Sequence, residues 1–141
     1  MSRLILTVTF LILLSACTKD DGIILKSSAS ELFWLRNKGA DMPVLVEGNT
    51  ASKVFILYLH GGPSDGSIYM NRYFGNITHN IENEFAMVYW DQRWIGESVG
   101  LVEEEHLNRM QYLEDLEKLI VLIKYRYGND IQMFMMGHSW G

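Results

Sequence analysis

Three short runs of apolar residues constrain the fold of this 141-residue chain more than any other feature of its sequence. The runs are residues 54–59, 85–90 and 131–136, and the third contains a single amide side chain, Gln132. Continuous apolar runs of this length are typical of strands that are buried on both faces. We therefore expect each run to form a strand of one central sheet.

The segments between these runs have helical patterns. Residues 68–84 are weakly periodic, and we expect a helix within them. Between the second and third runs, apolar residues recur at spacings of three and four, as in an amphipathic helix. They are Met110, Leu113, Leu116, Ile120, Ile123 and Tyr127. Glu114 and Lys118 have the order that favours an i, i+4 ion pair, and Gly128 suits a left-handed C-cap. This alternating order of three strands and two helices predicts an α/β fold with a mostly parallel central sheet.

A hairpin is expected before these elements. Residues 32–36 and 44–47 are short β-prone segments, and a turn-forming cluster at residues 38–41 separates them. We expect both segments to be edge strands.

The last five residues carry the most informative motif. Gly137, His138, Ser139, Trp140 and Gly141 match G-x-S-x-G directly after an apolar strand, which is the context of a nucleophile elbow. The sharp turn would expose the Ser139 hydroxyl, and the flanking glycines would avoid collisions with neighbouring elements. Ser139 is therefore the predicted catalytic nucleophile.

A second loop, at residues 60–63, follows the first strand and has the sequence His-Gly-Gly-Pro. In this type of fold such a loop supplies an oxyanion hole, in which backbone N–H groups stabilise the charge of a tetrahedral intermediate. Because proline has no N–H, we expect Gly62 to give one donor and Trp140 the other. His60 is expected to brace the backbone of the loop rather than to act as a base.

A third loop, at residues 91–98, follows the second strand and begins Asp-Gln-Arg. Together the HGGP, DQR and GHSWG motifs resemble those of prolyl iminopeptidases and their α/β-hydrolase relatives. The resemblance implies a serine aminopeptidase that acts through an acyl-enzyme, and a chiefly architectural role for Asp91 and Arg93. Ser64 and Trp94 stand where this family usually has glycine, and Trp94 is in a position to reshape the entrance of the site. A lipase or esterase is the alternative enzyme.

A serine hydroxyl needs a histidine base and an acid to orient it, and in α/β-hydrolases both follow the serine along the chain. None of the four histidines follows Ser139. We therefore expect residues 31–141 to be the N-terminal part of an α/β-hydrolase domain, truncated after the elbow. By itself this part is expected to be inactive and poorly folded. A non-catalytic envelope lipoprotein on a degenerate hydrolase scaffold is the alternative of another class.

The N-terminus resembles a bacterial lipoprotein signal. An apolar stretch at residues 4–14 follows Arg3 and precedes the tetrapeptide Leu-Ser-Ala-Cys at residues 14–17. The stretch is shorter than the roughly 20 residues of a membrane span. We expect residues 1–16 to be a cleaved signal, Cys17 to be lipidated and residues 17–30 to be a tether. This places the protein in a bacterial cell envelope, at the outer membrane.

The charge and the residue composition of the chain limit the classes of partner and cofactor that we expect. The formal net charge of −5 argues against nucleic acid, and no Cys/His cluster has the spacing of metal ligands. The acidic run Glu103, Glu104 and Glu105 is more typical of a solvated segment than of a metal site. No metal or organic cofactor is expected. The expected substrate is a small peptide, ester or amide, and the membrane contact is the lipid anchor.

Labelled palmitate should enter the protein through Cys17, because this cysteine ends the lipobox-like tetrapeptide. Cys17→Ala should abolish both the labelling and the partitioning into membranes. A variant that kept both properties would rule out the lipoprotein assignment.

Overall fold

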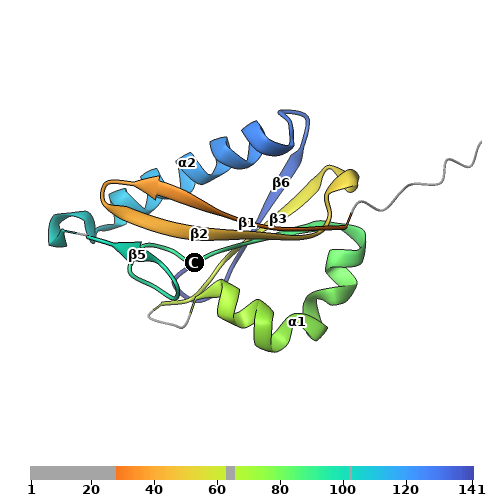
Figure 1. Ribbon diagram of the computed structural model, residues 1–141, viewed down its shortest axis with the longest axis horizontal. Helices are drawn as coiled ribbons and strands as arrows, with labels where there is room; N and C mark the ends of the chain where they lie inside the picture. Colours follow the sequence, from red (N-terminus) through yellow and green to blue (C-terminus); the bar gives the residue numbers. More distant parts are fainter. Residues whose placement is uncertain (1–27, 63–65, 102) are drawn as a thin grey trace, which may run out of the picture.

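One mixed β-sheet with a helix on each face organises the chain (Figure 1). The computed structural model describes residues 28–62, 66–101 and 103–141. The elements in chain order are β1 (Ser28–Asn37), β2 (Ala40–Asn49), η1 (Thr50–Ser52), β3 (Val54–Leu59), α1 (Ser67–Glu84), β4 (Ala86–Trp90), β5 (Val99–Gly100), η2 (Glu104–His106), α2 (Arg109–Tyr127) and β6 (Gln132–Gly137). The expected signal, Cys17 and most of the tether lie outside the described residues, as do Pro63 and Ser64.

The three apolar runs form β3, β4 and β6, as predicted. The sheet order is β1-β2-β4-β3-β6, and β3 pairs in parallel with both β4 and β6. Parallel strands need crossover connections, and α1 and α2 supply them. The predicted α/β fold class, with an α/β-hydrolase type of sheet, is therefore confirmed.

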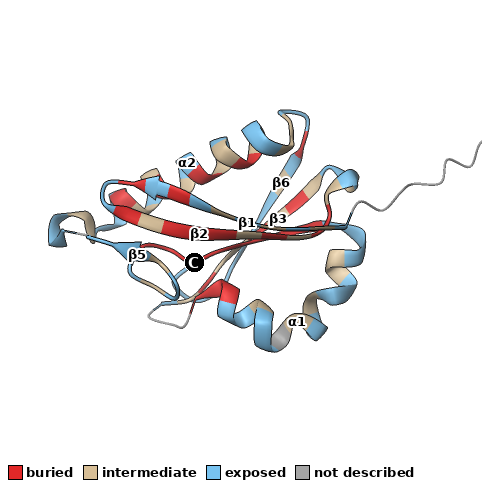
Figure 2. Cartoon of the chain, in the orientation of Figure 1, coloured by how far each residue is buried: buried red, intermediate tan, exposed pale blue. Residues whose placement is uncertain are grey.

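The two faces of β4 show how the helices cover the sheet. Val88 and Trp90 belong to the larger core with Leu119 of α2, whereas Met87 and Tyr89 pack with the α1 side. All five residues of β4 are buried. Figure 2 shows this burial as red along the middle strands. Within the described residues, no helix is long and apolar enough to cross a membrane.

The prediction of buried faces is wrong for β6. Phe134, Met135 and Met136 are 56%, 60% and 40% exposed. Among the described strands, β6 pairs only with β3 and lies at the sheet edge. The apolar sequence of β6 therefore predicts a strand that is suited to burial, but it does not show which other elements would bury it.

The hairpin is confirmed, with a tighter turn than expected. β1 and β2 are antiparallel, and only Lys38 and Gly39 connect them, with φ of 42° and 77°. Two central residues with positive φ give the turn that suits the twist of a hairpin. The prediction of two edge strands is right for β1 and wrong for β2, because β2 also pairs with β4 and, at its start, with β5.

Helix α2 confirms the predicted helix, and the predicted apolar stripe is confirmed in part, since Ile123 is buried and Leu116 and Tyr127 pack against the core. Its fully buried residues are Gln111, Asp115, Leu119 and Ile123. Met110 of the predicted stripe is 69% exposed. The predicted ion pair is present, with Glu114 Oε1 at 2.9 Å from Lys118 Nζ. Gly128 ends the helix with φ of 109° and ψ of 151°, so the prediction of a left-handed helical C-cap is wrong.

A buried ion pair explains the polar face of α2. Arg93 and Asp115 are both fully buried, and the guanidinium donates from Nε to Oδ2 at 2.6 Å and from Nη2 to Oδ1 at 2.9 Å. Asn37 Nδ2 also donates to Asp115 Oδ1, at 2.6 Å. The carboxylate thus ties the loop after β4 to α2 and to the β1–β2 hairpin.

A second buried carboxylate braces the start of α1. Asp91 is fully buried, and its Oδ1 accepts the Ile68 N–H at 3.0 Å. Its Oδ2 accepts the Glu97 N–H at 2.9 Å. A carboxylate at a helix N-terminus satisfies free N–H groups there. Asp91 and Arg93 therefore hold the loop at residues 91–98 from its first residues, which agrees with the architectural role expected for both.

Asp115→Asn should lower the free energy of unfolding by about 3 kcal/mol, because it leaves the buried Arg93 charge without a counter-ion. Urea denaturation of the full-length protein measures the change. Arg36→Met is the matched control, since it breaks an exposed pair in which Nε lies 2.8 Å from Asp41 Oδ1. The control should change stability by less than about 1 kcal/mol. Equal effects of the two substitutions would contradict the conclusion that the buried Asp115 carboxylate ties the loop, the helix and the hairpin together.

The stability of the protein should fall in acid partly through Glu114. Hydrogen bonds from Lys38 and Lys118 lower the pKa of Glu114 from 4.5 to about 2. A lowered pKa in the folded state gives stability that is present above the unfolded value of 4.5 and is lost as the pH falls through about 2. Glu114→Gln should therefore flatten the fall in urea midpoint between these pH values. If the urea midpoint of Glu114→Gln fell with pH as steeply as that of the wild type, the Glu114 carboxylate would not contribute to the loss of stability in acid.

Candidate active site

The turn after β6 has the geometry of a strained elbow. β6 ends at Gly137, and Ser139 follows with φ of +57°, a region that L-residues other than glycine rarely adopt. The Gly141 N–H donates to the His138 carbonyl at 3.0 Å and closes the turn. The side chain of Ser139 is exposed.

The two glycines of the motif are required by close backbone approaches. A Cβ on Gly137 would lie 2.7 Å from the Gly141 carbonyl oxygen. A Cβ on Gly141 would lie 2.0 Å from the Leu59 carbonyl oxygen. Neither gap can hold a side chain, so the predicted reason for the glycine spacing is confirmed.

The loop after β3 lies against this turn. The His138 N–H donates to the Leu59 carbonyl at 3.0 Å. A Cβ on Gly61 would be 3.2 Å from the Ser139 Cβ, and one on Gly62 would be 3.5 Å from the Trp140 ring. Within residues 28–62, 66–101 and 103–141, the Gly62 and Trp140 amides have no hydrogen-bond acceptor. The structure thus brings the three predicted site residues together, with two amides available to a ligand.

The position of His60 fixes its tautomer. Its ring is almost fully buried, and Nε2 accepts the Gln92 N–H at 3.1 Å, so the ring proton is on Nδ1. Nδ1 is 2.7 Å from the Gly61 carbonyl oxygen and donates to it. In a trans peptide the N–H points opposite to the carbonyl, so the Gly62 N–H is turned away from this ring. His60 therefore braces the loop, as expected from the sequence.

A cavity of about 250 Å³ opens beside the two loops. Its lining residues come from the ends of β3, β4 and β6 and from the start of α2, and they are His60, Gly62, Gln92, Ile95, Tyr112 and Trp140. The Tyr112 ring meets the Trp140 ring edge-on, with centroids 6.0 Å apart. Its hydroxyl donates to the Arg93 carbonyl at 3.4 Å, and burial raises the pKa of the Tyr112 phenol.

Sequence reasoning did not identify Tyr112 or Ile95 as site residues. Tyr112 does not stand out from the apolar and charged residues of the α2 sequence. Ile95 lies in a loop for which the sequence predicts a chiefly architectural role. One signal could have found Tyr112: it lies in the first turn of the helix that follows the loop after β4. Because a crossover helix begins after the carboxyl end of a parallel strand, its first turn lies near the edge of the sheet where the three loops meet.

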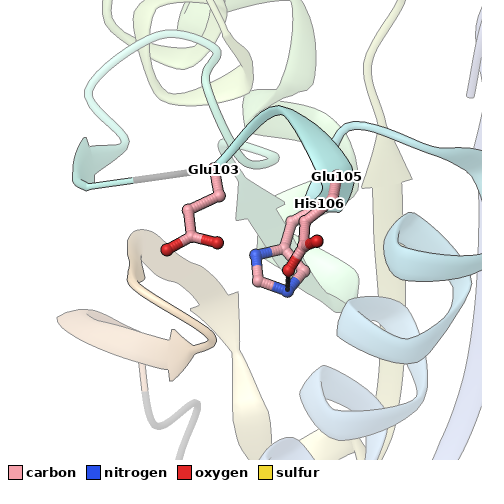
Figure 3. A group of neighbouring side chains, drawn as sticks. All are labelled: Glu103, Glu105 and His106. Atoms are coloured by element: carbon pink, nitrogen blue, oxygen red, sulfur yellow. Dashed lines mark ion pairs between the residues drawn. The ribbon is translucent and has the colours of Figure 1, made fainter.

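A separate group of side chains lies at η2 (Figure 3). Glu103, Glu105 and His106 each offer an oxygen or nitrogen atom, and these atoms lie within 4.8 Å of one another. His106 Nε2 is 3.7 Å from Glu105 Oε1, and both glutamates are exposed. The sequence did not indicate that His106 would join the acidic run. Because exposed carboxylates of this kind are common without an ion, we assign no metal to the group.

Comparison with known proteins finds a probable aminopeptidase and several epoxide hydrolases among the similar proteins. No protein-family model matches the chain. The probable aminopeptidase YbaC of Bacillus subtilis (strain 168) is 25% identical over 99 residues, which are 70% of this chain and 30% of that protein. A variant of a Vigna radiata epoxide hydrolase has a TM-score of 0.59 and 25% identity, over 79% of this chain and 31% of that one. The epoxide hydrolase VrEH1 of Vigna radiata has the same TM-score at 20% identity, with the same two coverages.

The chain spans about a third of the length of the proteins it matches. These structural matches, together with the observed strand order, show that the chain contains part of an α/β-hydrolase fold.

Proposed function

We propose that the protein is a serine hydrolase in which Ser139 is the nucleophile. The observation that carries this proposal is the positive φ of Ser139 in a turn whose glycines leave no room for side chains. Residues keep such a conformation at functional sites more often than elsewhere. The side chain of Ser139 is exposed, and the proposed oxyanion donors are the amides of Trp140, the next residue, and of Gly62, which lies against the Trp140 side chain.

The proposed reaction is acyl transfer. The Ser139 oxygen attacks the carbonyl carbon of an amide or ester, and its proton passes to a base. The carbonyl oxygen becomes an oxyanion that the two amides stabilise, and each such donor contributes about 3 kcal/mol where measured. Collapse expels the amine or alcohol and leaves an acyl-enzyme, which water then hydrolyses.

His60 is not the proposed base. Its Nε2 accepts a backbone N–H, and its Nδ1 proton is committed to the Gly61 carbonyl. The ring therefore has no free lone pair for the Ser139 proton. We assign the base and its orienting acid to no described residue.

An aminopeptidase of the prolyl iminopeptidase type is the favoured substrate class. The similarity to a probable aminopeptidase supports it, as does the motif set of the three loops. An ester-cleaving enzyme is the alternative, and a non-catalytic binding protein is the alternative of another class. We further propose that a lipid on Cys17 holds the protein at a bacterial envelope membrane, and this rests on the lipobox-like sequence alone.

The full-length protein should react with a fluorophosphonate probe, and Ser139→Ala should abolish the reaction, because the probe phosphorylates an activated serine in an oxyanion hole. Activity-based labelling followed by peptide mapping measures it. Ser52→Ala is the matched control, since Ser52 is remote in sequence and bonds to backbone carbonyls. A folded full-length protein that stayed unlabelled would favour the binding protein.

Turnover of three substrates should then rank the enzyme classes. We expect a proline arylamide to be cleaved faster than a short acyl ester, and both faster than the opening of styrene oxide. All turnover should be lost in Ser139→Ala. Preference for the ester would replace the aminopeptidase by an esterase, and preference for the epoxide would follow the structural neighbours instead.

A further inference from the structure

Trp94 has a backbone conformation that suits glycine. Its φ is +65°, and the Ile95 N–H donates to the Gln92 carbonyl at 3.0 Å, so Trp94 is the third residue of a tight turn. Positive φ at that position is the type II arrangement, where glycine is favoured. A bulky aromatic residue with positive φ is a genuine outlier.

Nothing in the packing of the described residues offsets this strain. Of the four described non-glycine residues with positive φ, Lys38 forms the hairpin turn and Ser139 forms the elbow. Lys53 donates from Nζ to the Tyr127 carbonyl at 3.0 Å. Trp94 is 65% exposed and makes no ring or cation–π contact within the described part of the chain. Aromatic packing among the described residues therefore gives no reason for a tryptophan rather than a glycine at this position.

The place of Trp94 in the fold suggests that reason. Gln92 and Ile95, the ends of its turn, both line the cavity beside the elbow. Buried hydrogen bonds of Asp91 and Arg93 anchor the loop just before Trp94. Trp94 thus lies on a fixed loop, in the turn between two residues that line the cavity, and its side chain is exposed.

We infer that Trp94 determines substrate specificity by contacting a flat apolar group next to the scissile bond. The inference rests on the proposed function for the identity of the site. Ile95, Tyr112 and Trp140 make the neighbouring wall largely apolar, and no carboxylate lines the cavity within the described residues. The acids nearest to Trp94 in sequence, Asp91 and Glu97, are both engaged: Asp91 is buried and accepts backbone N–H groups, and Glu97 is paired with Arg72. These surroundings favour an apolar ring over a substrate cation.

Binding can be tested apart from turnover. In the ¹⁵N-labelled full-length protein, loss of one indole resonance in Trp94→Phe assigns the Trp94 N–H. Phenylacetamide should shift this resonance and bind at least fivefold more weakly to Trp94→Gly than to the wild type. Trp94→Phe, which keeps a ring, should bind within about twofold of the wild type. Trp34→Phe is the control for an exposed tryptophan on β1 and should not change binding.

Three results would overturn the inference. One is equal affinity of phenylacetamide for Trp94→Gly and the wild type. Another is a larger shift of the Trp94 resonance with tetramethylammonium than with phenylacetamide, since that would make the rim a cation site. The third is a lower melting temperature for Trp94→Gly, because removing the strain should raise it by roughly 2–5 °C.

Turnover by the same variants separates this inference from the proposed function. Trp94→Gly should lower kcat/KM for a phenylacetyl ester about tenfold relative to an acetyl ester with the same leaving group. An unchanged ratio overturns the inference and leaves Ser139 as the nucleophile. Loss of the phenylacetamide site in Trp94→Gly, in a protein without Ser139-dependent turnover, overturns the proposed function and with it the specificity role, and leaves Trp94 as a ligand-binding residue only.

Discussion

The ion pair between Arg93 and Asp115 is the contact on which the arrangement of this end of the molecule depends. Both side chains are fully buried, so each charge loses its water and is tolerable only against the other. The pair is bidentate, which fixes direction as well as distance. Because Arg93 lies in the loop after β4 and Asp115 lies on α2, the pair sets where this helix begins relative to the sheet. Tyr112, one turn earlier on α2, is thereby held over the turn that carries Trp140.

Parallel pairing concentrates the remaining site residues at one edge of the sheet. β3 and β6 run in register up to the pair Leu59 and Gly137, so the loops that follow them leave the sheet side by side. The bond from the His138 N–H to the Leu59 carbonyl extends this alignment by one residue into the elbow. The loop after β3 and the turn after β6 therefore need no long-range side-chain contact to meet. Strand register alone places Gly61 against Ser139.

The sequence predicted what depends on local pattern, and it missed what depends on partners distant along the chain. The runs at residues 54–59 and 85–90 became strands because continuous apolar segments are stable only inside a covered sheet. The burial of Asp115 on α2 was not predicted, because this carboxylate enters the core only with Arg93, and helical periodicity treats a carboxylate as solvent-facing. The exposure of Phe134 was missed for a related reason, since burial of a strand depends on what lies beside it and not on its own composition. Gly137 and Gly141 were interpreted correctly because steric exclusion at a sharp turn is a local property.

Two strained residues, Ser139 and Trp94, lie in turns that follow β6 and β4, the two parallel strands on either side of β3. Strain in a protein persists where surrounding contacts leave the backbone no alternative, and here those contacts can be named. The elbow is held by its own turn bond and by the Leu59 carbonyl, and the turn of Trp94 by the buried anchors Asp91 and Arg93. The backbone strain of these two turns lowers the stability of the folded protein. Because the turns are already rigid, they lose little conformational entropy when a ligand binds. The same anchors that make the loop architectural therefore make an exposed indole on it a well-defined surface for recognition.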